Sequence, residues 1–386
     1  MLSLRLLGVT ECKPPESVRH NYPNKEQGPQ SHAQLIVHKE VRMLPAIFGL
    51  EGLQLTDNEC DFFRASQPMG FILFGRNIES KRQVAALTAS LRETLGRDNL
   101  PILIDQEGGR VARLTAPEWP SFPPAACFAT AWEQDPEAAI RATELNYEAL
   151  GLELAAVGIS VDCAPVLDIP QPGAHDIIGD RAFGSDPAAV ARLGRAALDG
   201  LARAGVVGVI KHIPGHGRAM ADSHHDLPRV TADDTALALD LAPFTALADA
   251  PMAMTAHILY EAWDTEHCAT LSKTIIRSII RERIGFDGLL MSDDLDMKAL
   301  SGSVPELALA ALNAGCDVAL NCWGKMSDMQ GMAELLPEAT VSARHRLAEA
   351  MAAAQPLGES VDMSKRQEAL MADRDSLLKS VNDGAV

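Results

Sequence analysis

Side chains able to hold and transfer protons gather in one short stretch of this 386-residue chain. Residues 211–217 read Lys-His-Ile-Pro-Gly-His-Gly, and Asp222 and His224 follow shortly after them. An imidazole with a pKa of about 6.5 can donate and accept a proton near neutral pH, and a nearby carboxylate favours its charged form. The apolar run 206–210 ends directly before this stretch, at the kind of strand-to-loop junction where α/β enzymes place reactive residues.

Short apolar runs, each followed by a stretch compatible with a helix, organise the rest of the chain. There are eight: Ala46–Leu50, Gly70–Phe74, Pro101–Ile104, Ile159–Ala164, Val206–Ile210, Met252–Ala256, Gly288–Met291 and Asp317–Leu320. Apolar strands of this kind are covered on both faces, and eight of them in alternation with helices predict an α/β fold with a single (β/α)8 TIM-type barrel. An open doubly wound sheet is the alternative. The lack of a Gly-x-Gly-x-x-Gly turn after an early run disfavours it.

The helix expected after the fourth run shows how the boundaries are set. Asp186 can cap its start, Pro187 fits its first turn, and Gly205 can end it. Its apolar face is expected to consist of Val190, Leu193, Ala197, Leu198 and Leu201.

Reactive residues accumulate where the predicted strands end. They are Asp105 and Glu107, Asp162 and Asp168, Lys211 and His212, His257, and Asp293 and Asp294. Taken singly, such groups also occur as helix caps, buried ion pairs or solvated loops, and Arg113 and Arg181 could form surface ion pairs. Because strand ends converge on one mouth of a barrel, their coincidence predicts a shared site there.

Composition limits the partners and the compartment. The chain is 47% apolar with a formal charge of −18, which indicates a globular protein and argues against nucleic acid or an anionic membrane as partner. No apolar run approaches the roughly 20 residues that cross a bilayer. The seven cysteines form no Cys-x-x-Cys pair, so we expect a cytoplasmic protein. Residues 1–42 predict a flexible extension, and 43–386 a barrel followed by C-terminal helices.

Several motifs together resemble glycoside hydrolase family three, and within it the bacterial β-N-acetylglucosaminidases of cell-wall recycling. The motifs are Phe71–Asn77, Ile104–Val111, Gly179–Phe183, Lys211–Gly217, Asp222–His224 and Ser292–Leu295. They follow one another in order between Met43 and Trp323. The resemblance implies a single (β/α)8 barrel enzyme, and we expect a monomer without a cofactor. It would remove terminal β-linked N-acetylglucosamine from muropeptides, with an anhydromuramoyl peptide as the leaving group.

The resemblance also assigns roles to individual residues. Asp293 is implied as the nucleophile, because a carboxylate can attack the anomeric carbon and divide one difficult displacement into two steps. His224 is implied as the acid/base, with Asp222 orienting it; His225 is a second imidazole beside it. Binding of the sugar in the first subsite is assigned to Asp105, Arg113, Arg181, Lys211 and His212, whose charged groups make strong hydrogen bonds to hydroxyls.

Other functions remain open at this point. A glycoside phosphorylase would keep the fold and nucleophile, since a histidine acid/base does not repel phosphate as a glutamate would. A catalytically silent sugar-binding protein would need neither Asp293 nor His224. A metal-dependent barrel amidohydrolase would bind its metal through histidines and nearby aspartates. The candidate histidines are His212, His216, His224, His225 and His257. Such sites take ligands from several strands, whereas most of these histidines lie on one loop.

Overall fold

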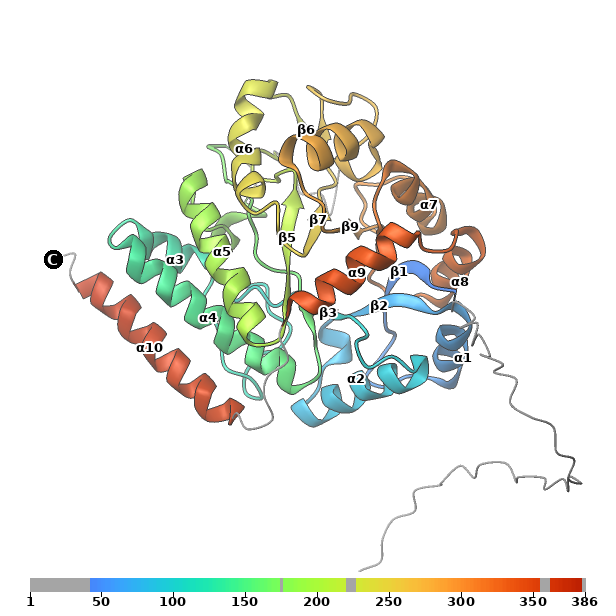
Figure 1. Cartoon of the computed structure of the whole chain (residues 1–386), viewed down its shortest axis with the longest axis horizontal. Helices are drawn as coiled ribbons and strands as arrows, with labels where there is room; N and C mark the ends of the chain where they lie inside the picture. The colour runs from blue at the N-terminus through green and yellow to red at the C-terminus, as the bar shows by residue number, and fades with distance from the viewer. Residues whose placement is uncertain (1–41, 174–175, 220–226, 355–361, 384–386) are drawn as a thin grey trace, which may run out of the picture. The chain divides into compact units, whose positions relative to one another are not determined.

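A computed structural model describes residues 42–173, 176–219, 227–354 and 362–383. Its centre is a closed barrel of eight parallel strands in the order β1-β10-β9-β7-β5-β4-β3-β2 (Figure 1). The strands are β1 (Leu44–Gly49), β2 (Pro68–Leu73), β3 (Ile102–Ile104), β4 (Val161–Asp162), β5 (Val207–Ile213), β7 (Met252–Thr255), β9 (Leu289–Asp294) and β10 (Val318–Asn321). Each overlaps one of the eight predicted runs, so the prediction of an α/β barrel is confirmed and the open sheet is not formed.

Helices follow the strands and cover the outside of the barrel (Figure 1). They are α1 (Asp57–Ser66), α2 (Lys81–Leu95), α3 (Ala125–Trp132), α4 (Pro136–Ala156), α5 (Pro187–Arg203), α6 (Asp234–Ala246), η4 (Ile275–Ile284), α7 (Val304–Ala314) and α8 (Met326–Leu335). Short 3-10 turns occur at η1 (Gly75–Asn77), η2 (Gly179–Arg181) and η3 (Ala269–Leu271). A small pair of parallel strands, β6 (Arg229–Val230) and β8 (Leu259–Tyr260), lies outside the barrel sheet.

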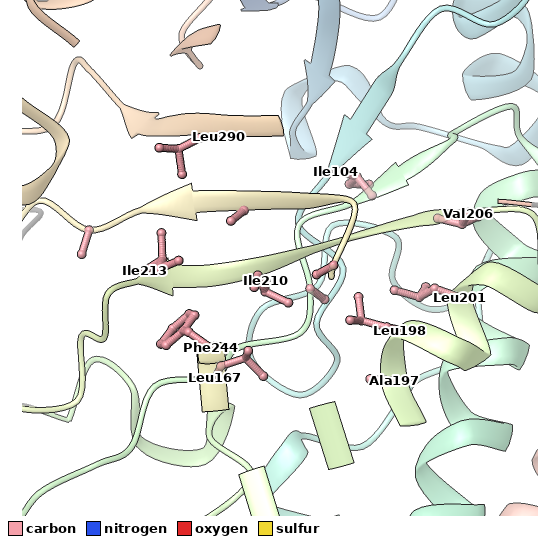
Figure 2. Close-up of a cluster of buried hydrophobic side chains, with 14 of the residues drawn as sticks. Ile104, Leu167, Ala197, Leu198, Leu201, Val206, Ile210, Ile213, Phe244 and Leu290 are labelled. Carbon is pink, nitrogen blue, oxygen red and sulfur yellow. The ribbon is translucent and has the colours of Figure 1, made fainter. Parts of the chain in front are cut away.

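The helix α5 begins and ends as its sequence predicts. The Asp186 carboxylate accepts a hydrogen bond from the backbone N–H of Ala188, and Pro187 occupies the first turn. Gly205, just past its end, has a φ of +77°, a left-handed conformation that favours glycine. All five residues of the predicted apolar face are buried, and Figure 2 shows Ala197, Leu198 and Leu201 packed toward Val206 and Ile210 of the neighbouring strand region.

Alternate residues of each strand enter different hydrophobic clusters. Val207 and Val209 of β5 belong to the cluster that fills the barrel, whereas Ile210 belongs to the outer cluster beneath the helices, where Figure 2 shows it. This follows from the two-residue period of a strand, which points successive side chains to opposite faces. Burial on both faces explains why the strands are apolar almost throughout.

Two further helices follow the last strand. Residues of α9 (Val341–Ala353) join the interior cluster, and the Ala339 N–H donates to the Met43 carbonyl beside the start of β1. This places α9 at the amino-terminal end of the barrel, opposite the predicted site. The last helix, α10 (Met363–Asp383), packs along α4, where Arg366 pairs with Glu148. The predicted C-terminal helices are therefore present. The predicted extension, 1–42, lies almost wholly outside the described residues.

Candidate active site

The inward-facing positions of the strands continue into polar residues at the carboxyl ends. Leu103 of β3 faces the interior and is followed in the same register by Asp105; Leu289 and Met291 of β9 are followed by Asp293. At the ends of the strands the inward-facing residues thus change from apolar to charged, while still pointing into the barrel. Charged side chains from separate strands therefore meet at one mouth of the barrel.

These side chains enclose a cavity of about 270 Å³. Its walls come from several strands and from the loops that follow them. The lining residues are Asp105, Glu107, Arg110, Val111, Arg113, Ile177, Ile178, Arg181, Lys211, His212, His216, Met254 and Asp293.

Two of the strands that carry these residues, β5 and β9, end three residues later than predicted. Lys211 and His212 were expected beyond the fifth run, yet β5 extends to Ile213 and contains both. The expectation was wrong because backbone hydrogen bonds to β7 propagate the strand regardless of side-chain polarity. The register shifts between Lys211 and Ile213, opposite Met254 and Thr255, and the two successive residues Lys211 and His212 both line the cavity.

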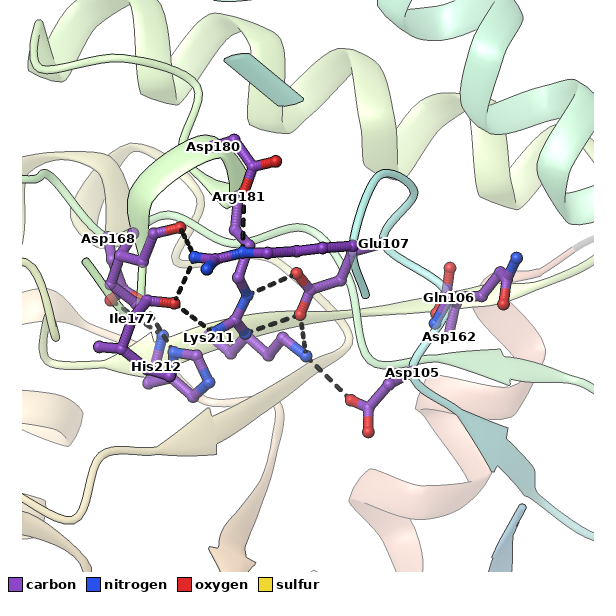
Figure 3. Close-up of polar contacts among 12 residues, drawn as sticks. Asp105, Gln106, Glu107, Asp162, Asp168, Ile177, Asp180, Arg181, Lys211 and His212 are labelled. Atoms are coloured by element: carbon purple, nitrogen blue, oxygen red, sulfur yellow. Dashed lines mark hydrogen bonds and ion pairs between the residues drawn. The ribbon is translucent and has the colours of Figure 1, made fainter. Parts of the chain in front are cut away.

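Lys211 lies at the centre of a charged network (Figure 3). Its Nζ lies 3.0 Å from Asp105 Oδ1 and 2.6 Å from Glu107 Oε1. Arg181 donates two hydrogen bonds to the Glu107 carboxylate, Nε to Oε2 at 2.7 Å and Nη2 to Oε1 at 2.8 Å. Arg113 Nη2 lies 3.3 Å from Asp105 Oδ2. Each buried acid thus has two cationic partners, which offset the cost of removing its charge from water.

The network keeps its members charged at neutral pH. Burial alone would raise the pKa of Asp105 and Glu107, but the Lys211 charge, with those of Arg113 and Arg181, outweighs burial and lowers both. Burial alone would lower the pKa of Lys211, and here the Asp105 and Glu107 carboxylates raise it instead. The cavity therefore offers fixed donors and acceptors to a polyhydroxylated ligand.

A third buried acid, Asp168, holds His212 at the end of β5 and His216 in the loop that follows. Its Oδ2 lies 2.7 Å from His212 Nδ1, while its Oδ1 accepts the backbone N–H groups of His212 and His216. Burial opposes ionisation of Asp168, but His212 and these hydrogen bonds lower its pKa to about 2. With Nδ1 engaged, Nε2 of His212 is the ring atom left for the cavity. Burial, followed by the charge of His212, lowers the pKa of His216 to about 4.

Asp293 lies where the first cavity meets a second one. Its Oδ1 accepts the backbone N–H of Asp294 at 2.8 Å. The second cavity has a volume of about 350 Å³ and shares Asp105, Arg113, Met254 and Asp293 with the first. Its remaining lining residues are Ile72, Phe74, Arg76, Asp294, Asp296, Met297, Lys298, Leu320, Cys322 and Trp323. The Asp293 carboxylate can thus reach a ligand atom at the junction of the two cavities.

Three strand-end residues serve the structure instead of lining either cavity. His257 Nδ1 lies 2.7 Å from Thr270 Oγ1, and its Nε2 lies 2.9 Å from the Asp294 carbonyl, so it supports the tip of β9. Asp162 accepts the backbone N–H of Gln106, and burial raises its pKa well above the ordinary value. Asp168 acts through His212. Each of these three strand-end residues therefore supports a neighbour at the site without lining either cavity itself.

The structure brings together six of the eight residues that the sequence singled out. They are Asp105, Arg113, Arg181, Lys211, His212 and Asp293. Asp222 and His224, together with His225, lie outside the described residues. The sequence identifies Glu107 only as a strand-end acid, and because it lies in the loop past β3 the strand period does not predict its direction.

The described residues were searched for metal-binding clusters and for membrane-spanning helices. No group of three or more His, Cys, Asp or Glu side chains among them is arranged to hold a metal ion. In the same part of the chain, no helix has the length and apolarity needed to cross a membrane.

Comparison with known proteins agrees with this architecture. Residues 40–353 match the family described as Glycosyl hydrolase family 3 N terminal domain. The chain is 40% identical over 286 residues to the β-hexosaminidase of Bordetella avium, an alignment that covers 72% of this chain and 80% of that protein. The crystal structure of native NagZ from Neisseria gonorrhoeae is similar with a TM-score of 0.77 and 30% identity, covering 88% of this chain and 98% of NagZ. The same protein in complex with N-trifluoroacetyl-D-glucosamine gives a TM-score of 0.78 at 30% identity, covering 86% and 99%.

Proposed function

Because this chain belongs to glycosyl hydrolase family 3 and is a glycoside hydrolase, we propose that it removes terminal β-linked N-acetylglucosamine with retention of configuration. The observation that carries the proposal is the convergence of Asp293 with the Lys211 network on one cavity. The name β-hexosaminidase of its relative and the N-trifluoroacetyl-D-glucosamine bound by NagZ support the choice of sugar.

The sugar is held by the first cavity. Asp105 accepts hydrogen bonds from ring hydroxyls. Lys211 and Arg113 donate hydrogen bonds to hydroxyl oxygens of the sugar, and His212 Nε2 can donate to or accept from a hydroxyl, depending on its tautomer. Because these groups are already fixed by one another, little reorganisation is needed when the sugar binds. The sugar is oriented so that its anomeric carbon lies at Asp293.

Asp293 then attacks the anomeric carbon. The bond from Asp293 oxygen to carbon forms as the bond from carbon to the leaving oxygen breaks, giving a covalent glycosyl-enzyme and a protonated leaving group. Water attacks the same carbon in the second step, releases the carboxylate and yields the β-configured sugar. Two displacements at one carbon retain its configuration.

His224 supplies the proton to the leaving oxygen and later removes one from water, with Asp222 orienting the ring. The assignment rests on the family resemblance, since both residues lie outside the described residues. It is supported by the position of His216, six residues before Asp222, in the wall of the first cavity. The loop that carries His224 therefore leaves β5 from the site itself.

The natural substrates that we propose are muropeptides in the cytoplasm, cleaved by a monomer that needs no cofactor. The family resemblance is the support for the anhydromuramoyl peptide as leaving group. Cleavage of purified muropeptides, followed by chromatography of the released sugar, tests this choice. Treatment with a metal chelator should leave cleavage unchanged. A loss of cleavage would show that the enzyme needs a metal.

The nucleophile is tested by trapping it. Incubation with a slowly hydrolysed 2-acetamido-2-deoxy-5-fluoroglucosyl fluoride, followed by proteolysis and mass spectrometry, should locate the label on the peptide that contains Asp293. The exposed acid Asp61 on α1 supplies a control: Asp61→Asn should label normally and Asp293→Asn should not. Labelling of another carboxylate would overturn the assignment. Added phosphate should yield no sugar 1-phosphate; its formation would identify a phosphorylase.

A further inference from the structure

We infer that Arg374 of the last helix, α10, is a positioning residue for the turn that carries Glu107. This turn, residues 107–111, forms part of the wall of the first cavity. The step rests on the proposed function, because it takes this cavity as the sugar site. The helix itself lies beyond residues 40–353, the part of the chain that matches the family.

Arg374 lies at the centre of the face with which α10 packs against α3 and α4 (Figure 1). Among the described side chains of α10, the buried ones are Gln367, Arg374 and Val381, whose spacing of seven residues places them on one face. Such a face is ordinarily apolar, yet Arg374 is only 4% exposed. Its Nε donates to Asp375 Oδ1 at 2.8 Å. Because a charge is costly to bury without partners, the other contacts of Arg374 indicate its role.

One of these contacts is with the aromatic ring of Phe122. The guanidinium carbon of Arg374 lies 6.0 Å from the ring centre, a distance at which a cation is attracted to the ring. The Phe122 carbonyl accepts the backbone N–H of Gly109 at 2.9 Å. The turn also lies directly against the same segment, since a Cβ added to Gly108 would come within 2.5 Å of the Pro123 carbonyl oxygen. A shift of Phe122 would therefore displace the turn.

The other contact is with α4. Arg374 Nη1 donates to Asn146 Oδ1 at 2.9 Å, and Asn146 is fully buried. The next residue of α4, Tyr147, donates its hydroxyl to the Glu107 carbonyl at 3.3 Å. Arg374 thus joins the two segments, at Phe122 and at Tyr147, that hydrogen-bond the backbone of the turn.

The position of the turn matters to the cavity because it fixes Glu107. The Glu107 carboxylate holds Lys211 and Arg181, and all three side chains line the cavity. A turn that is held less firmly would loosen these groups, so more reorganisation would accompany binding of the sugar. We therefore expect Arg374 to act on the affinity for the sugar more than on bond cleavage.

Hydrogen exchange tests whether Arg374 holds the turn. In Arg374→Met, which keeps an unbranched side chain but removes the charge, the Gly109 amide should exchange about threefold to tenfold faster than in wild type. Arg374→Lys, which keeps the charge without the planar group, should give a smaller increase; it carries the comparison alone if Arg374→Met does not fold. Lys379→Ala removes an exposed cation from the same helix and should change nothing. Wild-type exchange at Gly109 in the Arg374 variants overturns the inference.

Inhibition by N-acetylglucosamine tests the effect on the site. With 4-nitrophenyl β-N-acetylglucosaminide as substrate, well below the melting temperature, Arg374→Met should raise the inhibition constant about threefold to tenfold and change kcat less than about twofold. A residue that only stabilises the fold would lower the melting temperature and leave the inhibition constant unchanged, and that result would also overturn the inference. If wild type does not cleave the substrate, the proposed function fails, while the exchange of Gly109 still decides whether Arg374 holds the turn.

Discussion

Replacing Glu107 with glutamine should destabilise the protein far more than its modest change in shape suggests. The Glu107 side chain is 5% exposed and pairs with Lys211 and Arg181, which are 3% and 11% exposed. With Asp105 and Arg113 the network carries two negative and three positive charges, so the substitution leaves one negative charge against three positive ones. Breaking a buried pair from one side costs about 3–5 kcal/mol, because the remaining charges stay buried without compensation.

An exposed pair provides the matched control. Glu137 is 80% exposed and pairs with Arg192, so Glu137→Gln should cost no more than about 1 kcal/mol. Free energies of unfolding from urea titrations at pH 7 compare the two variants with wild type. The reasoning would be refuted if Glu107→Gln were within about 1 kcal/mol of Glu137→Gln, because the network would then contribute no more than a surface pair.

The stability difference between wild type and Glu107→Gln should also depend on pH. The folded pKa of Glu107 is lowered against its unfolded value of about 4.3, so its stabilisation is present above that pH and is lost as the pH falls through the folded value. The stability gap between wild type and Glu107→Gln should therefore narrow as the pH is reduced from 7 to about 3. A gap that stayed constant would mean that the Glu107 charge is not what stabilises the fold.

Further variants test the assigned roles. Asp293→Ala should abolish turnover without lowering the melting temperature by more than a few degrees; a rate near that of wild type, measured with 4-nitrophenyl β-N-acetylglucosaminide, would exclude it as the nucleophile. His224→Ala should slow the cleavage of alkyl glycosides much more than that of activated aryl glycosides, because a good leaving group needs little protonation; equal losses would assign the proton transfer elsewhere. Asp168→Asn should lower kcat/KM about tenfold to a hundredfold by releasing His212 from a charged hydrogen bond, whereas an unchanged value would show that the ring is oriented without Asp168.

The barrel could be predicted because the sequence carries two simple patterns: apolar strands and capped helices between them. Burial on both faces makes each strand apolar almost throughout, and the intervening helices carry recognisable caps such as Asp186 and terminators such as Gly205. Strand ends were predicted less well. A polar residue such as Lys211 after an apolar run predicts the end of the strand, but backbone pairing does not depend on the side chain, and β5 continues to Ile213.

Most of the candidate site also followed from the sequence, but the pairing within it did not. A run of residues shows that Asp105, Glu107 and Lys211 lie near strand ends, yet only the three-dimensional register shows that one lysine serves both acids. The sequence identifies Asp168 as a strand-end acid, but its role depends on β5 bringing the His212 ring against it, 44 positions further along the chain. Contacts of this kind are set by tertiary geometry, which no local pattern encodes.

The two-residue period of a strand predicts which of these residues point into the barrel. Counting by twos from the buried Val207 and Val209 reaches Lys211, and from Leu289 and Met291 it reaches Asp293. From Leu103 the same count reaches Asp105, directly after the end of β3. The same count places Asp162 on the outer face, since its neighbours Val161 and Cys163 face the interior. His212 departs from the rule, and it does so where the register shifts between Lys211 and Ile213. Directions within a regular strand are thus predictable from sequence, whereas the irregularity that adds one more side chain to the cavity is not.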